Sequence, residues 1–172
     1  MSAVADHTGR LLVALPSLID PNFDRTVVYL LDHGDGGAVG LVLNRPSDTE
    51  VTDVLPRWAD ALGDPAVVFA GGPCEPEVGI AVAPGGAHGV QTIDLDGDPM
   101  LAARPVRVFA GYAGWGPRQL DAEIAEGAWV VVDGGAGDVF SAEPRQLWPR
   151  VLRRQGGDLA RLSLLPDDLS VN

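Results

Sequence analysis

A mixed α+β domain is the fold class that the sequence predicts, and three observations support it. Short runs of β-prone residues recur along the chain, Gly-rich turns connect several of them, and only a few segments between them have helical periodicity. This pattern differs from the regular strand and helix alternation of a parallel α/β sheet. With 172 residues, 46% of them hydrophobic, the chain is long enough for one core and short for two. We therefore expect a single domain over 1–172, with a flexible N-terminus over 1–9.

Three strands are expected near the start of the chain. Residues 10–15 form a short apolar run that Pro16 closes. Residues 26–31 and 38–43 are rich in Val, Leu and Tyr, and they flank a segment of Asp, His and Gly. Two β-prone runs around such a segment predict a hairpin, in which the glycines permit positive φ.

The middle of the chain combines one helix with three strands. Apolar residues recur at helical spacing over 51–62, with Thr49 as a candidate cap, but Pro56 requires the helix to begin later or to bend. Residues 66–70 have the composition of a buried strand. Residues 78–83 and 90–95 predict a second hairpin, because a Pro- and Gly-rich turn separates them.

The last third of the chain predicts further strands and two helices. Residues 106–112 form an apolar strand, followed by a Gly114-Trp115-Gly116 turn and a helix from Pro117 to about Gly127. Residues 128–133 and 139–140 are expected as final strands. Residues 143–155 are expected as a helix, because their apolar side chains fall on one face.

Four sequence blocks carry a family resemblance. The longest is LPSLIDPNFDRT over 15–26, which continues through the expected hairpin to Asn44-Arg45-Pro46. The others are Gly71-Gly72-Pro73, GYAGWG over 111–116, and Leu147-Trp148. Together they closely resemble the YqgE/AlgH family of bacterial proteins, over most of residues 10–172. The resemblance implies a bifurcated, largely antiparallel sheet with a small barrel-like portion and flanking helices. The AlgH name also implies an association with the regulation of alginate synthesis.

Net charge and apolar runs bear on localisation and partners. The formal charge of −12 argues against nucleic acid and anionic membrane surfaces, which Lys and Arg chiefly bind. No apolar run approaches the roughly eighteen residues of a membrane-spanning helix, and Asp6 and His7 stand where a signal peptide would be basic or apolar. The single cysteine, Cys74, excludes an internal disulfide. These features predict a cytoplasmic protein.

One segment departs from this acidic average. From Glu143 to Arg161 the chain holds five Arg against two acidic residues, which gives a local charge of +3. We name residues 145–161 the basic face, and it is a candidate docking surface for an acidic protein partner. The alternative is that these arginines lie on the solvated side of a helix and pair with acidic residues of the same chain.

Two groups of residues are candidates for binding a small anion. In the first, block 111–117 has the layout of a strand, a glycine turn and a helix start, where backbone N–H groups and the helix dipole can receive an anion. Its candidate binding residues are Tyr112, Gly114, Trp115 and Gly116. The alternative is that the glycines allow tight packing and that the Trp115 ring fills the core.

The second group lies at the ends of the first hairpin. Arg25 and Arg45 offer bidentate donors to a carboxylate or phosphate, and Asn44 stands beside them. The alternative is structural, with Arg25 paired to a nearby aspartate and Arg45 fixing the chain. Since both groups follow apolar strands, we expect Asn44 and Arg45 to border the same concave site as the block from Tyr112 to Trp115.

The sequence carries no recognisable catalytic, metal or cofactor motif, so we expect none of the three. Cys74 has no His beside it in the sequence, and the acidic stretch 94–98 lacks the Gly and Glu positions of a calcium loop. The three His residues and one Cys do not have zinc-site spacing.

A non-enzymatic regulatory or accessory protein, acting through a protein partner or a small anionic ligand, is therefore the predicted function. One alternative is an enzyme with an unrecognised site built from Asp20, Asp24, Arg25, Asn44 and Arg45. The other is a direct transcriptional regulator, which the net charge and the lack of a helix-turn-helix pattern disfavour.

Overall fold

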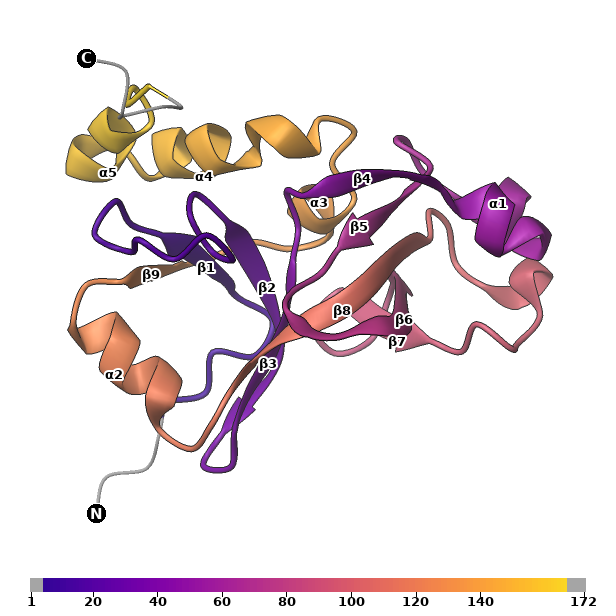
Figure 1. Cartoon of the computed structure of the whole chain (residues 1–172), viewed down its shortest axis with the longest axis horizontal. Coiled ribbons are helices and arrows are strands. Elements are labelled where there is room, and N and C mark those ends of the chain that lie inside the picture. Colours follow the sequence, from indigo (N-terminus) through magenta and orange to yellow (C-terminus); the bar gives the residue numbers. More distant parts are fainter. Residues whose placement is uncertain (1–4, 167–172) are drawn as a thin grey trace.

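The computed structural model describes residues 5–166, which form one curled sheet of nine strands with helices packed against it (Figure 1). The sheet forms a half-barrel and divides into two branches that share a single strand. The predicted α+β class and the bifurcated, largely antiparallel sheet are therefore confirmed. Strand pairing is antiparallel except between β5 and β8 and at an isolated bridge from Leu62 to Val106.

The first branch contains the predicted hairpin and the two strands beside it. Its order is β9-β1-β2-β3-β8, with strands β1 (Leu11–Ala14), β2 (Val27–Gly34), β3 (Gly37–Val42), β8 (Arg107–Trp115) and β9 (Trp129–Val132). Both strands of the hairpin extend into the segment expected as a loop. Gly37 permits this because its φ is +123° and a Cβ there would lie 2.2 Å from the Trp115 carbonyl oxygen.

The second branch is built around the first half of β8. It comprises β4 (Pro46–Glu50), β5 (Val67–Ala70), β6 (Cys74–Pro84) and β7 (Val90–Ile93), with β5 and β6 on either side of β8. β8 changes branch after Gly111, which has φ +76°, a left-handed value that interrupts a regular strand. Before it, Phe109 pairs with Phe69 and Ile80, and after it Ala113 pairs with Gly40.

The predicted helix over 51–62 is divided in two. An α-turn, α1 (Val51–Val54), ends at Leu55, and a 3₁₀ helix, η1 (Pro56–Ala61), follows. Pro56 causes the break because it lacks the N–H that would continue the α-helical bonds. Thr49 is not the cap, since it lies in β4 and Glu50 occupies the N-cap position.

Three predictions in the last third are wrong. The Gly114-Trp115-Gly116 turn is instead the end of β8 up to Trp115, and α2 (Gln119–Ala125) starts two residues later than Pro117. The expected strand over 139–140 is a short helix, α3 (Ala136–Val139). The helix expected over 143–155 is confirmed as η3 (Pro144–Gln146) and α4 (Leu147–Gln155). Strand β4 and the helices η2 (Pro99–Leu101) and α5 (Gly157–Leu162) were not predicted.

Three apolar clusters hold these elements together. The largest lies between the sheet and α4 and contains Trp148, Val151 and Leu152. A second packs α2 against the other face of the first branch, and a third packs α1 and η1 against the second branch. Figure 1 shows α4 and α2 on opposite sides of the first branch, with α1 at the far end of the second.

The N-terminal segment is attached to the sheet from His7 onward. The backbone N–H of His7 donates to Nδ1 of His33 at 3.1 Å, and the N–H of Gly9 donates to the carbonyl of Leu30 at 2.8 Å. The expectation of flexibility over 1–9 stays a prediction, and residues 1–4 lie outside the described residues. Within 5–166, no helix is both long and apolar enough to cross a membrane.

Candidate anion-binding cavity

A cavity of about 520 Å³ lies where four segments meet, and we name it the arginine cavity. The segments are the loop before β2, the residues after β3, the start of α4 and the chain after α5. Three arginines and one aspartate line it, namely Arg25, Arg45, Arg145 and Asp24, together with Asn44, Gln146, Trp148, Pro149, Ser163 and Leu165. The predicted residues Arg25, Asn44 and Arg45 therefore line one cavity.

Asn44 fixes the backbone at this site. Its Nδ2 donates to the Arg25 carbonyl at 2.8 Å, and its Oδ1 accepts from the Val27 N–H at 3.0 Å. Both ends of the amide are thus bound to the chain that enters β2. Asn44 positions Arg25, which has φ +55°, a conformation that an L-residue seldom adopts without support.

Arg45 binds the loop that precedes Arg25. Its Nη1 donates to the Asn22 carbonyl at 2.6 Å, and its Nη2 donates to the carbonyls of Pro21 and Asp24 at 3.0 and 3.2 Å. These acceptors are uncharged backbone carbonyls, so these contacts do not neutralise the positive charge of the guanidinium. Burial lowers the pKa of Arg45, and the carboxylates of Asp24 and Asp20 oppose that shift.

Arg25 joins the cavity to the chain after α5. Its Cζ lies 4.7 Å from the centre of the Trp148 ring, and its guanidinium donates to the carbonyls of Leu165 (3.2 Å) and Pro166. The Trp148 ring is itself fixed, because its Nε1 donates to the Ala14 carbonyl at 2.8 Å. The cation–π contact therefore has a rigid partner.

Arg145 is the charged residue of the cavity that the sequence did not connect with the others. It lies on η3 at the cavity wall, and its side chain forms no hydrogen bond or ion pair with any residue in 5–166. The sequence placed it only in the basic face. No local pattern could have joined it to Arg45, because a hundred residues separate them.

The residues of block 111–116 do not contribute to this cavity. Tyr112 donates its hydroxyl proton to Glu75 at 3.0 Å, which raises the tyrosine pKa. Gly114 and Trp115 pair with β3, and the Gly116 N–H donates to the Gln119 side chain at 3.0 Å. The structure therefore does not bring this block together with Arg45, and the Gly116 N–H expected to face an anion is already bonded within the described chain.

The acidic residues of the alternative enzyme site have different environments. Asp20 accepts the Asn22 N–H at 2.9 Å and so closes a turn within the loop. Asp24 lines the arginine cavity. Within residues 5–166, no group of three or more His, Cys, Asp and Glu side chains is arranged to hold a metal ion.

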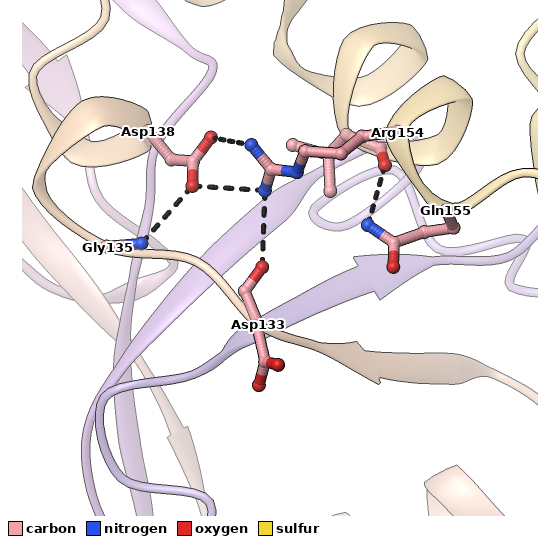
Figure 2. A network of polar contacts seen from close by, with 6 residues as sticks. Asp133, Gly135, Asp138, Arg154 and Gln155 are labelled. Atoms are coloured by element: carbon pink, nitrogen blue, oxygen red, sulfur yellow. Dashed lines mark hydrogen bonds and ion pairs between the residues drawn. The ribbon is translucent and has the colours of Figure 1, made fainter.

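Most of the basic face pairs with acidic residues of the same chain. Figure 2 shows Arg154, whose Nη1 and Nη2 bind the two oxygens of Asp138 at 3.0 and 3.2 Å and whose Nη2 also donates to the Asp133 carbonyl. Arg150 pairs with Glu143, and Arg161 pairs with Asp158. Among the described residues, this leaves Arg145 and Arg153 as the members of the face without such partners.

Sequence comparison assigns the family. The AlgH-like family model (DUF179) matches residues 11–160 of this chain. The chain belongs to the AlgH-like family. This AlgH-like chain is also 51% identical to a UPF0301 protein of Streptomyces coelicolor over 190 residues, which cover 100% of this chain and 98% of the relative. A UPF0301 protein of Thermobifida fusca is 47% identical, with 96% and 95% of the two chains covered.

Solved structures of similar proteins share the fold. A Corynebacterium diphtheriae protein of known crystal structure superposes with a TM-score of 0.87 and 28% identity, over 96% of this AlgH-like chain and 95% of that one. The solution structure of the AlgH protein from Pseudomonas aeruginosa superposes with a TM-score of 0.72 and 27% identity, with 98% of both chains covered.

Proposed function

We propose that this chain is a non-enzymatic regulatory or accessory protein that binds a small anionic ligand, such as a phosphate ester or a carboxylate, in the arginine cavity. The observation that carries the proposal is the charge of the cavity wall, where three arginines face one aspartate. Guanidinium groups bind phosphate and carboxylate through paired N–H donors. The whole chain has a charge of −12, so the cavity differs in charge from the molecule as a whole.

The contacts within the cavity support positioning of the cations. Arg45 and Asn44 use their hydrogen bonds to hold backbone segments, and Arg25 stacks on a buried indole. These contacts fix the guanidinium groups before any ligand arrives, which lowers the entropy lost on binding. Arg145 supplies donors that a ligand can engage, because its exposed side chain has no other partner within 5–166.

Thermal-shift measurements with inorganic phosphate, phosphosugars, nucleotides and di- and tricarboxylates test this proposal. A ligand that binds only the native state raises the melting temperature as its concentration rises. Arg145→Ala should remove that increase. Arg153→Ala is the matched control, since Arg153 is also exposed and unpaired within the described chain but does not line the cavity. Equal responses of the two variants, or no response of the wild type to any anion, would contradict the proposal.

An acidic protein partner is the second candidate, favoured by the pairing of the basic face. Arg145 and Arg153 stay unpaired in the described structure while their neighbours on the face pair locally. A partner carrying carboxylates would bind both. In that case Arg145→Ala and Arg153→Ala should weaken partner capture to similar degrees. Binding of a ligand confined to the cavity should instead be weakened by Arg145→Ala alone.

A further inference from the structure

The second branch of the sheet leaves part of one face uncovered. Phe69 and Phe109 point into the core beneath α4, so the alternate residues Val68, Ala70 and Ala110 point to the other side. There, α1 and η1 cover the part of the face that holds Ala81, Ala83 and Val106. The remainder forms a groove of about 700 Å³, within the roughly 300–1,000 Å³ typical of small-molecule sites.

The walls of this groove are fixed by contacts outside it. Trp58 Nε1 donates to the Leu95 carbonyl at 3.1 Å, and Arg57 Nη2 lies 3.3 and 3.4 Å from the carbonyls of Leu95 and Gly97. These bonds hold the loop that carries Asp96. The Tyr112 hydroxyl binds Glu75 in the irregular part of β6, next to Pro76 and Glu77, which line the groove. The groove is therefore formed before a ligand binds.

The floor of the groove is apolar and is made of small residues. Because Ala70, Gly79 and Ala110 carry small side chains or none, the space above the sheet is left unfilled. Val54 and Leu55 form the edge nearest α1, and Val54 is 55% exposed. An apolar ligand group placed here would remove this surface from water, which favours binding in proportion to the area covered.

Its rim is acidic. The groove is lined by Glu77 and Asp96, both exposed, and neither carboxylate has a hydrogen-bond or ion-pair partner in residues 5–166. The segment 46–105, which builds this half of the molecule, holds ten Asp or Glu residues against two Arg. No basic residue lines the groove. A bound anion would meet repulsion from every charged group in the site.

We propose that this acid-rimmed groove, defined by Val54, Ala70, Glu77, Asp96 and Ala110, binds a small organic cation that carries an apolar group, such as an arylalkyl or alkyl amine. The apolar group lies on the alanine floor, and the ammonium group lies near the two carboxylates. A bare metal ion does not fit, because it would gain nothing from the apolar floor. The inference is independent of the arginine cavity, whose lining has the opposite charge.

A pair of probes with the same ring and opposite charge tests the proposal. 2-Naphthylmethylamine is protonated at neutral pH, whereas 2-naphthylacetate is an anion. Titration calorimetry with the full chain should show binding of the amine and at least about tenfold weaker binding of the acid. Backbone amide NMR should place the amine shifts at Ala70, Asp96 and Ala110.

Variants separate the contributions of charge and shape. Removing one exposed carboxylate should weaken amine binding about two- to fivefold in either Glu77→Gln or Asp96→Asn. Glu50→Gln is the matched control, because Glu50 is exposed on β4 in the same acidic segment but does not line the groove.

Ala70→Phe should abolish binding because the larger ring fills the floor of the groove. Retention of the wild-type far-UV circular dichroism spectrum is the check on folding. Equal affinity for the two probes, an equal effect of Glu50→Gln, or no amine binding at millimolar concentration would overturn the inference.

Discussion

Trp115 stabilises the molecule by joining three segments of one cluster. Its ring centre lies 6.0 Å from those of both Phe23 and Trp129, and its Nε1 donates to Glu123 at 3.2 Å. The same Glu123 oxygen accepts the Trp129 indole at 3.0 Å, so one carboxylate from α2 satisfies two buried donors. The packing role considered from the sequence agrees with the burial of Trp115, which is only 6% exposed.

Trp115→Ala should therefore lower the free energy of unfolding by about 3–5 kcal/mol, the usual effect of removing a buried indole. Denaturant titration measures it. Trp115 does not line the arginine cavity. Anion binding per folded molecule should therefore stay at the wild-type level. A variant of unchanged stability that no longer binds ligand or partner would mean that Trp115 acts in recognition.

We expect His7 to make stability depend on pH. Burial lowers its pKa from 6.5, as do the nearby His33 and Arg10, while Asp121 and Asp6 oppose the shift. The folded state thus binds this proton less tightly than the unfolded state. Stability is complete above the unfolded value and falls as the pH drops through it toward the folded pKa.

We expect the denaturant concentration at the midpoint of unfolding to decrease as the pH is lowered from about 7.5 to about 5.5. We expect this decrease to be smaller in His7→Ala. The variant keeps the backbone N–H that donates to His33, so it removes the titrating ring and preserves the anchor. An unchanged pH dependence in His7→Ala would assign the effect to another group.

At the scale of elements, local patterns predicted strands better than short helices. Both hairpins have β-branched runs on either side of Gly-rich turns, and β2–β3 and β6–β7 confirm them. The 3.6-residue period over 51–62 correctly predicted burial of Val51 and Trp58, but Val54, at the same spacing, is 55% exposed. Pro56 decided the backbone geometry. At 139–140, Val and Phe favour a strand, whereas Asp138 accepts the Gly135 N–H at 3.2 Å and favours the helical turn α3.

The contact between α3 and α4 gives a prediction at this scale. Asp138 is buried, closes the first turn of α3 and receives both Nη groups of Arg154 (Figure 2). Asp138→Ala removes all of these bonds and should cost about 2 kcal/mol. Glu143→Ala breaks the exposed pair with Arg150 and should cost no more than about 1 kcal/mol. Equal midpoints in denaturant for the two variants would show that burial of Asp138 adds nothing.

At the scale of the whole molecule, the sequence predicted only part of the arginine cavity. Arg25, Asn44 and Arg45 were recognisable because polar residues stand together at the ends of apolar strands. Arg145 and Trp148 were not, since only the packing of α4 on the sheet places them beside β3. The acid-rimmed groove has no sequence pattern at all, because its floor is made of small residues from β5, β6 and β8 that meet only in the sheet.

The separation of charge between the two ends of the molecule predicts its behaviour toward DNA. Segment 46–105 holds ten acidic residues against two Arg, and three arginines of the basic face pair with carboxylates of the same chain. Few cations therefore remain to displace counterions from a phosphate backbone, and the net charge of −12 repels a duplex over about a Debye length. We expect no submicromolar binding of random duplex DNA in fluorescence anisotropy, even at low salt. Binding that is both submicromolar and steeply salt-dependent would require a basic surface larger than Arg145 and Arg153 provide, and would favour the DNA-binding alternative.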